Sequence, residues 1–178
     1  KTVEAKNVVV AVGSTPIEIP GFPFDGESVW SSTHALAPKQ LPKRMIVIGG
    51  GYIGLELGLV YHKLGTEIRV LEFMDRVLPG MEEELSKEMG RSLKKKKIEV
   101  HLKTKATGFK KTKNGLEVSA EVDGKPQTFE CDVVLSCVGR RPSGKGLGLE
   151  AIGVKVDDRG FVTVDHRRMT NVAGIYAI

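Results

Sequence analysis

The sequence of 178 residues predicts an α/β fold: a parallel sheet in which an antiparallel β-meander takes the place of one crossover helix. The short apolar run 45–48 has the composition of a strand buried on both faces, and a helical pattern separates it from the next predicted strand, 67–71. Further along, Asn114-Gly115 and Asp123-Gly124 separate three short strand patterns and favour type I′ turns. A strand–helix–strand unit followed by hairpins is therefore expected.

The chain opens with a dense β-branched run, 8–12, which is expected to form a strand that enters a turn at Gly13. Pro38 and Pro42 bracket a linker before the first apolar run, so a domain boundary is predicted near residue 41. The predicted organisation is a segment 1–40, a domain 41–142 and a return segment 143–178.

The run 45–48 is followed at once by Gly49, Gly51 and Gly54, which fall at the G-x-G-x-x-G spacing. In this motif the first glycine permits a tight turn, the second lets backbone approach a diphosphate, and the third lets helix and strand pack closely. The N–H groups of the first helical turn then point at the phosphates. Because these glycines would weaken a unit that binds nothing, the motif predicts a dinucleotide site.

A helix is predicted over 52–64, ending before Gly65, the residue expected at its carboxyl-terminal cap. Gly54 and Gly58 lie four residues apart, so they form one surface suited to close packing. The helix also carries an apolar stripe formed by Ile53, Leu57, Val60 and Leu64.

The strand 67–71 delivers Glu72 at its carboxyl end, about 20 residues after the first glycine, where an acid that binds the ribose hydroxyls is expected. A carboxylate there repels a 2′-phosphate by about 4 kcal/mol at ~4 Å and an effective dielectric constant of about 20. Arg76 lies close enough in sequence to weaken this repulsion, but no arginine replaces the acid. The sequence therefore predicts NAD(H) rather than NADP(H).

Much of the net charge of +5 comes from the lysines at 94–97. They close a predicted helix that the glutamates at 82–84 open, so both groups complement the helix macrodipole. No aromatic side chains alternate with the lysines, as a binder of single-stranded nucleic acid would need, so no nucleic acid partner is expected. The apolar stripe of this helix comprises Met81, Leu85, Met89 and Leu93.

Later strands are predicted over 98–102, 104–111, 116–122, 127–130, 131–138, 161–164 and 175–178. Cys131 and Cys137 are expected on one strand with Cα atoms about 20 Å apart. Because a disulfide needs Cα atoms within ~7 Å, both are predicted to be core residues. No metal site and no catalytic residue are predicted, since no ligand spacing or nucleophile partner is found for His34, His62, His101 or His166.

The composition is that of an ordinary globular chain, 40% hydrophobic and 28% charged. No apolar run approaches the ~18 residues of a membrane span and no signal segment opens the chain, so neither insertion nor secretion is expected. Two cysteines favour a reducing compartment, and a cytoplasmic location is predicted. The chain starts at Lys1 and ends in an apolar run at Ile178, so we expect it to be part of a longer protein.

Six motifs occur together: Ala11-Val-Gly-Ser-Thr-Pro16, Ile48-Gly-Gly-Gly-Tyr-Ile-Gly-Leu-Glu-Leu-Gly58, Val70-Leu-Glu-Phe73, Ser136-Cys-Val-Gly-Arg-Arg-Pro142, Leu147-Gly-Leu-Glu150 and Gly174-Ile-Tyr-Ala-Ile178. In this combination the sequence resembles the pyridine nucleotide–disulfide oxidoreductases along its whole length, most closely the branch that oxidises dihydrolipoamide. The resemblance implies a Rossmann-like FAD/NAD(P)-binding fold. The full-length enzyme would pass electrons from dihydrolipoamide through a disulfide and FAD to NAD⁺.

The resemblance also implies cofactor contacts. The domain 41–142 would bind NAD, with Ala106 near the adenine and Gly139 at the nicotinamide end, while 1–40 and 143–178 would belong to an FAD-binding domain. The turn Val12, Gly13 and Ser14 would contact the flavin, although Val12 departs from the usual threonine. Glu56 is also compatible with a solvated helix position. The NAD-binding set is Gly49, Gly50, Gly51, Tyr52, Ile53, Gly54, Leu55, Glu56, Glu72, Ala106 and Gly139.

Several features of the family are absent from the sequence: its first flavin-binding glycine motif, its redox cysteine pair and its catalytic His–Glu pair. The chain alone is therefore expected to be inactive. By resemblance, the full-length protein would be a homodimer that serves the lipoyl domain of 2-oxo acid dehydrogenase complexes. The alternatives are another NADH-dependent flavoprotein, of the NADH oxidase or ferredoxin reductase type, and a non-catalytic NADH-binding module.

Overall fold

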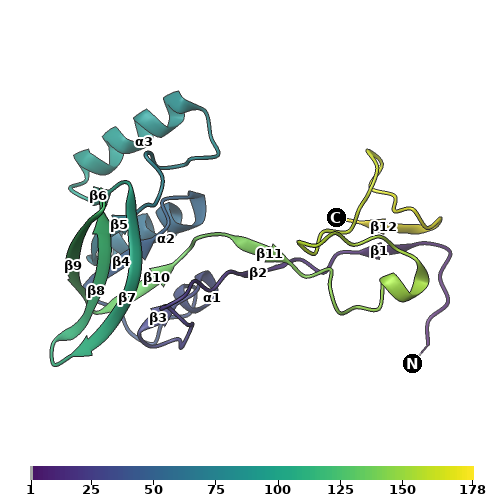
Figure 1. Cartoon of the computed structure of the whole chain (residues 1–178), viewed down its shortest axis with the longest axis horizontal. Coiled ribbons are helices and arrows are strands. Elements are labelled where there is room, and N and C mark those ends of the chain that lie inside the picture. The colour runs from purple at the N-terminus through teal and green to yellow at the C-terminus, as the bar shows by residue number, and fades with distance from the viewer. Residues whose placement is uncertain (1) are drawn as a thin grey trace. The chain divides into compact units, whose positions relative to one another are not determined.

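The computed structural model describes residues 2–178, whose contacts divide the chain into two compact units (Figure 1). The larger unit comprises residues 16–139, and the smaller unit comprises the residues up to 15 together with 140–178. The predicted boundaries at 40/41 and 142/143 separate segments by the cofactor that each would bind. The two compact units are defined by contacts within the chain, so they do not test these boundaries, which stay a prediction.

The larger unit is built on a five-stranded parallel sheet in the order β3-β10-β4-β5-β6. In the central strand, Val47 pairs with Leu135 on one side and with Val70 on the other, so neighbours occupy both edges of β4. The strands are β3 (Val29–Trp30), β10 (Val133–Ser136), β4 (Arg44–Ile48), β5 (Glu67–Leu71) and β6 (Glu99–His101).

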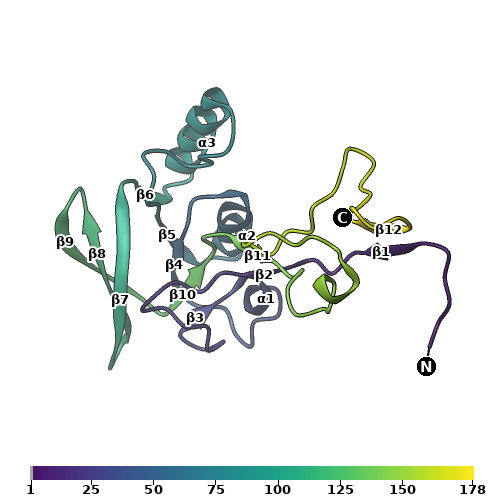
Figure 2. The ribbon, with the colours of Figure 1, turned by 45° about the vertical axis from the view of Figure 1, so that its right-hand side comes forward.

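Helices cover one face of this sheet and an antiparallel meander covers the other (Figure 2). Met45 and Val47 of β4 pack on the helical side, while Ile46 and Ile48 pack on the meander side, which is why the run is apolar throughout. The predicted fold class is confirmed. The covering elements are α1 (Ser32–Ala35), α2 (Tyr52–Lys63), α3 (Glu83–Lys95), β7 (Thr104–Thr112), β8 (Gly115–Val122) and β9 (Lys125–Cys131).

The two turns of the meander differ. Asp123 and Gly124 have φ angles of 47° and 77°, so the type I′ prediction is confirmed there. At the first turn, Thr112 pairs with Gly115, and neither of the two intervening residues has a positive φ. The type I′ prediction is therefore wrong at Asn114-Gly115, where Gly115 instead opens β8 with a φ of 127°.

The buried face of α2 is the one that carries the glycines. Gly54, Gly58 and Tyr61 are buried, whereas Val60 and Leu64 of the predicted stripe stay 52% and 57% exposed. The two glycines let the helix lie close to the strands, so their face, which also carries the buried Leu55, packs against the sheet, and Val60 and Leu64 turn away. Gly65, with a φ of 98°, ends the helix as predicted.

The apolar residues of α3 that pack into the core lie in its carboxyl-terminal half, although Ser86 near its start is also buried. Leu93 is buried and Met89 is half-buried, but Met81 and Leu85 are 46% and 54% exposed. The predicted stripe is therefore only partly buried.

Two short strand pairs begin in the smaller unit, although β2 ends at Pro16, the first residue of the larger one. β1 (Val8–Val10) runs parallel to β12 (Ile175–Ala177), and β2 (Ser14–Pro16) pairs with β11 (Arg140–Pro142). A short helix, η1 (Glu150–Ile152), precedes Gly153. The run 8–12 ends as a strand at Val10, and the strand predicted over 161–164 is reduced to one bridge between Val156 and Val162. The core comprises Val10, Leu149, Val154 and Ala177.

The two cysteines do not share a strand. Cys131 ends β9, whereas Cys137 follows β10. The one-strand prediction is therefore wrong, because the chain bends at Asp132 and passes from the meander into the parallel sheet. Both are free thiols packed in the core, as predicted. Burial raises the pKa of Cys131 to about 12 and that of Cys137 to about 11, so neither supplies a thiolate near neutral pH.

An ionic cluster ties the first residue of β4 to the meander. Arg44 pairs with Asp132 at 2.9 Å and Glu130 at 3.1 Å, and donates to the Asn114 carbonyl at 2.9 Å. Asp132 also accepts the backbone N–H groups of Lys43 and Arg44, at 3.0 and 2.9 Å. Partial burial alone would raise the pKa of Asp132, but these hydrogen bonds lower it below its ordinary 3.8.

Replacing Asp132 by asparagine is expected to destabilise the chain by about 1–2 kcal/mol at pH 7, a value discounted because the carboxylate is partly exposed. The pKa of the Asp132 carboxyl is lower in the folded chain than in the unfolded chain. Its contribution to stability is therefore complete above the pKa of the unfolded state and is lost as the pH falls through the pKa of the folded state. The difference between wild type and Asp132→Asn should therefore shrink below about pH 5. Urea unfolding at several pH values measures this, and a difference independent of pH would contradict it.

Within residues 2–178, no helix has the length and apolar character needed to cross a bilayer.

Candidate dinucleotide-binding site

The predicted glycine turn lies where three parallel strands end. Gly49 donates its N–H to the Leu71 carbonyl at 2.9 Å, and Cys137 donates to the Ile48 carbonyl at 2.8 Å. Gly49 has a φ of 101°, and a Cβ there would fall 2.5 Å from the carbonyl oxygen of Cys137. Only glycine fits this turn, which joins the carboxyl ends of β4, β5 and β10. In open α/β sheets, ligands bind at this edge, where the strand order reverses.

Helix α2 starts with unused donors at this edge. Its amino-terminal cap is Gly51, and the first intrahelical bond runs from Leu55 N–H to the Gly51 carbonyl, at 3.0 Å. In the described part of the chain, no protein acceptor is found for the N–H groups of Tyr52, Ile53 and Gly54. These donors, with the positive end of the helix dipole behind them, suit an anion.

The three glycines of the motif have different surroundings. A Cβ on Gly54 would lie 2.3 Å from the Gly49 carbonyl oxygen, so this glycine permits the close contact between helix and turn. A Cβ on Gly51 would meet nothing within 4 Å, and its φ of −76° suits any residue. The middle glycine is thus required by neither packing nor backbone, and it leaves open space at the start of the helix.

Glu72 lies directly beside this turn. Its side chain accepts the N–H of Gly50 through Oε2 and that of Met74 through Oε1, the latter at 2.7 Å. The residue is only 6% exposed, and its backbone is bonded to His101 and Thr104 at 2.9 and 2.8 Å. These bonds hold the carboxylate at the mouth of α2 with oxygen lone pairs still available for a ligand.

The loop after Glu72 is a part of the site that the sequence reasoning missed. Leu78 donates its N–H to the Gly50 carbonyl at 2.8 Å, and Val77 packs against Gly50. Phe73 and Met74 are 67% and 47% exposed next to the buried acid. Large apolar residues directly after a strand's carboxyl end are a signal that could have indicated this loop.

The other residues predicted for this site fall in different surroundings. Ala106 is half-buried near the start of β7, two residues after Thr104, which is bonded to Glu72. Gly139, with a φ of 136°, follows β10 and accepts the Ile17 N–H at 3.1 Å. Leu55 is buried in the core, and Glu56 is exposed on α2.

The residues predicted to contact a flavin belong to the smaller unit. Gly13 has a φ of 67°, and its carbonyl accepts the Ser143 N–H at 3.0 Å. Arg140 donates to the Ser14 hydroxyl at 2.7 Å and also to its carbonyl, so the Ser14 side chain already has a protein partner. Val12 is exposed and offers no side-chain hydrogen bond.

The sequence profile of the pyridine nucleotide-disulphide oxidoreductases matches residues 1–178, so the chain belongs to this family. The resemblance predicted from the motifs is confirmed. The chain is 47% identical to a dihydrolipoyl dehydrogenase of Bacillus subtilis over 179 residues and 45% identical to one of Thermus scotoductus over 181. A mitochondrial dihydrolipoyl dehydrogenase of Dictyostelium discoideum is 45% identical. The alignments cover 100% of the chain but only 37–39% of these relatives' length.

Solved structures agree with the fold. LpdA of Mycobacterium tuberculosis superposes with a TM-score of 0.86 at 30% identity, over 97% of this chain and 37% of that one. The HOCl-induced flavoprotein disulfide reductase RclA of Escherichia coli gives a TM-score of 0.85 at 25% identity, over 99% of this chain and 40% of that one.

Proposed function

We propose that the chain is the NAD(H)-binding portion of a dihydrolipoyl dehydrogenase. The observation that carries the proposal is the pairing of an open helix amino terminus with a buried carboxylate, Glu72, bonded to the glycine turn. The names of the relatives at 45–47% identity support the choice of this enzyme.

In this proposal the backbone N–H groups at the start of α2 bind the diphosphate. Glu72 accepts hydrogen bonds from the adenosine ribose, and Ala106 and Gly139 flank the adenine and nicotinamide ends. When bound, NAD⁺ supplies the acceptor for a hydride. Gly51 keeps the approach to the helix free of side-chain atoms, since no residue lies within 4 Å of its Cβ position.

The segments 1–40 and 143–178 would complete an FAD-binding domain, with Val12, Gly13 and Ser14 at the flavin. The redox disulfide and a His–Glu pair would come from other parts of the full-length protein. That protein would be a cytoplasmic homodimer serving the lipoyl domain of 2-oxo acid dehydrogenase complexes. The chain alone would bind NADH weakly and turn over no lipoamide.

A second candidate is a flavoprotein disulfide reductase with another substrate. The likeness to RclA favours it, but the identity is 25% compared with 45–47% for dihydrolipoyl dehydrogenases. A cysteine pair separated by four residues upstream of residue 1, together with His-x₄-Glu downstream, would favour the dehydrogenase.

The proposal is tested by titrating NADH into the chain and following the fluorescence of NADH. We expect saturable binding with NADH preferred over NADPH by about 100-fold, because Glu72 repels the 2′-phosphate. In Glu72→Gln this preference should fall to about tenfold or less. The variant should also lose about 1–3 kcal/mol of stability, since the new amide faces a backbone N–H.

Failure of both NADH and NAD⁺ to bind at millimolar concentration, or a wild-type preference for NADPH, would overturn the proposal. Lipoamide turnover by the chain alone would contradict its inactivity.

A further inference from the structure

A groove separates α3 from the edge strand β6, and its volume is about 820 Å³. One wall is formed by α3, through Ser86, Lys87, Gly90 and Lys94. The floor is formed by β6 and its neighbours, with Ile98 and Leu102. We call this the α3–β6 groove. None of the residues predicted to bind NAD or FAD lines it, and its volume lies in the range of small-molecule pockets, about 300–1,000 Å³.

Two groove residues, Gly90 and Lys97, are not the residue types that α3 and its carboxyl-terminal cap would favour. Gly90 lies inside α3, where alanine would favour the helix, and a Cβ there would meet nothing within 4 Å. Lys97 follows the helix with a φ of 60°, a conformation that favours glycine. Glycine thus stands where a side chain would narrow the groove, and lysine stands where glycine would suit the backbone. Departures of this kind are expected where residues serve a site.

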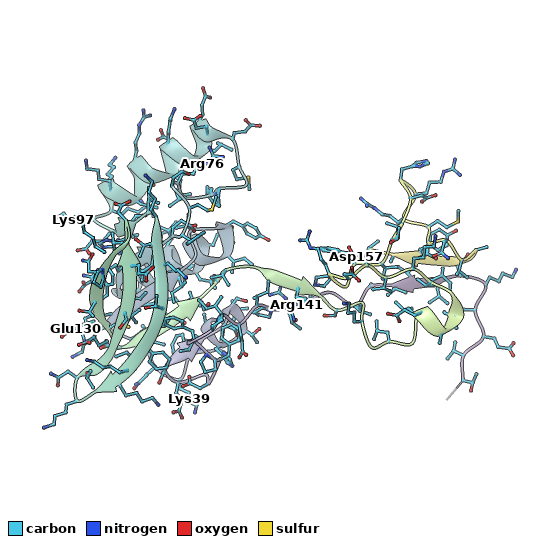
Figure 3. The ribbon with its side chains drawn as sticks, in the orientation of Figure 1. Lys39, Arg76, Lys97, Glu130, Arg141 and Asp157 are labelled. Atoms are coloured by element: carbon cyan, nitrogen blue, oxygen red, sulfur yellow. The ribbon has the colours of Figure 1, made fainter. Side chains whose placement is uncertain are left out.

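The positive charge in the groove collects near the carboxyl end of α3. Lys87 is paired with Glu83 at 2.6 Å, and the groove's Glu99 is paired with Arg69 at 2.6 Å. Within residues 2–178, Lys94 and Lys97 are in no ion pair. Figure 3 labels Lys97 at this end, and Arg76 on the loop that precedes the helix, where Asp75 also lines the groove.

The floor of the groove is apolar. Ile98, Val100 and Leu102 alternate along and beyond β6 toward the helical side, where they join the core that includes Leu93. A ligand that matches this groove therefore has an apolar body and an anionic group. We propose that the α3–β6 groove binds an elongated organic anion, with its apolar body on β6 beside Gly90 and its anionic group at Lys94 and Lys97.

The charge of the lysine run by itself does not explain this arrangement. All four lysines at 94–97 complement the dipole of α3, but only Lys94 and Lys97 line the groove. Lys95 and Lys96 have the same charge at the same helix end and lie outside it. They provide a matched control.

The groove and the dinucleotide site meet at one residue, Val77, which lines the groove and also packs against Gly50. The residues assigned to the ligand, which are Gly90, Lys94, Lys97 and the floor of β6, lie outside the dinucleotide site. The inference therefore does not depend on the proposed function.

The test uses 1-anilinonaphthalene-8-sulfonate, an aromatic anion whose fluorescence rises on binding, with the 178-residue chain. We expect one saturable site per chain. The double variant Lys94→Gln/Lys97→Gln should weaken binding about tenfold, through the loss of two charge contacts. Lys95→Gln/Lys96→Gln should change it less than about twofold. Gly90→Leu should abolish binding by filling the groove, and circular dichroism verifies that each variant is folded.

An equal loss in the two lysine variants would overturn the proposal, since it would show attraction to charge alone. Undiminished binding in folded Gly90→Leu would overturn it as well. Displacement of the probe by NADH would assign the probe to the dinucleotide site, again contradicting the inference.

Discussion

Replacing Gly51 by serine is expected to weaken NADH binding by about 100-fold without destabilising the fold. The added Cβ would meet no protein atom within 4 Å, and the φ of −76° suits serine. Serine is also a good amino-terminal cap, so its hydroxyl would accept an N–H of the first turn and stability should rise by a few tenths of a kcal/mol. The same hydroxyl and Cβ would occupy the space and the donors proposed for the diphosphate.

Fluorescence titration with NADH and urea unfolding of the same sample separate the two effects. Gly80→Ser is a suitable control, since a Cβ at Gly80 also meets nothing within 4 Å and the residue lies outside the proposed site. Unchanged NADH affinity in Gly51→Ser would show that the diphosphate does not approach the helix start.

The second large effect is a change in stability. Replacing a glycine of α2 by alanine is expected to lower stability at Gly54 and to raise it at Gly58, one turn further along the helix. In Gly54→Ala the new Cβ would lie 2.3 Å from the Gly49 carbonyl oxygen and 3.0 Å from Val47. Because a backbone atom cannot move aside without displacing the turn, we expect a loss of about 2–4 kcal/mol.

In Gly58→Ala the nearest atoms, on Ile68 and Val47, would lie at 3.5 Å, an ordinary contact. Alanine there should therefore stabilise the chain by about 0.5–1 kcal/mol through helix propensity. Urea unfolding of both variants beside wild type measures the two changes. If Gly54→Ala did not destabilise the chain, the close approach at Gly54 would be refuted.

Local patterns predicted the parallel strands and the meander because those patterns follow from neighbouring residues. The run of β4 is apolar because it is covered on both faces, and Asp123-Gly124 carries the backbone preference of its own turn. The buried face of α2 could not be predicted in the same way. Val60 and Leu64 are more apolar than glycine, yet close approach to the strands selected the face with Gly54 and Gly58.

In the candidate site, too, some features follow from neighbouring residues and others depend on how distant parts of the chain pack. The glycine spacing and the place of Glu72 follow from a strand–helix–strand unit, so the sequence indicated residues that the fold brings together. The bonds from Gly50 and Met74 to Glu72, and the loop that packs on Gly50, depend on how the chain returns after β5. The α3–β6 groove was also unforeseen, because a cavity arises from the separation of two elements and leaves no periodic pattern.

The strand order has a consequence for how the chain is made. Strand β3 has a single partner in the sheet, β10, which lies about a hundred residues further along the chain. During synthesis, β4, α2 and β5 can associate as soon as they emerge, whereas Val29 and Trp30 must wait for Val134 and Leu135. The β3 edge is therefore the last part of the sheet to close, and a nascent chain halted before residue 133 would leave these two apolar residues without a strand to pair with.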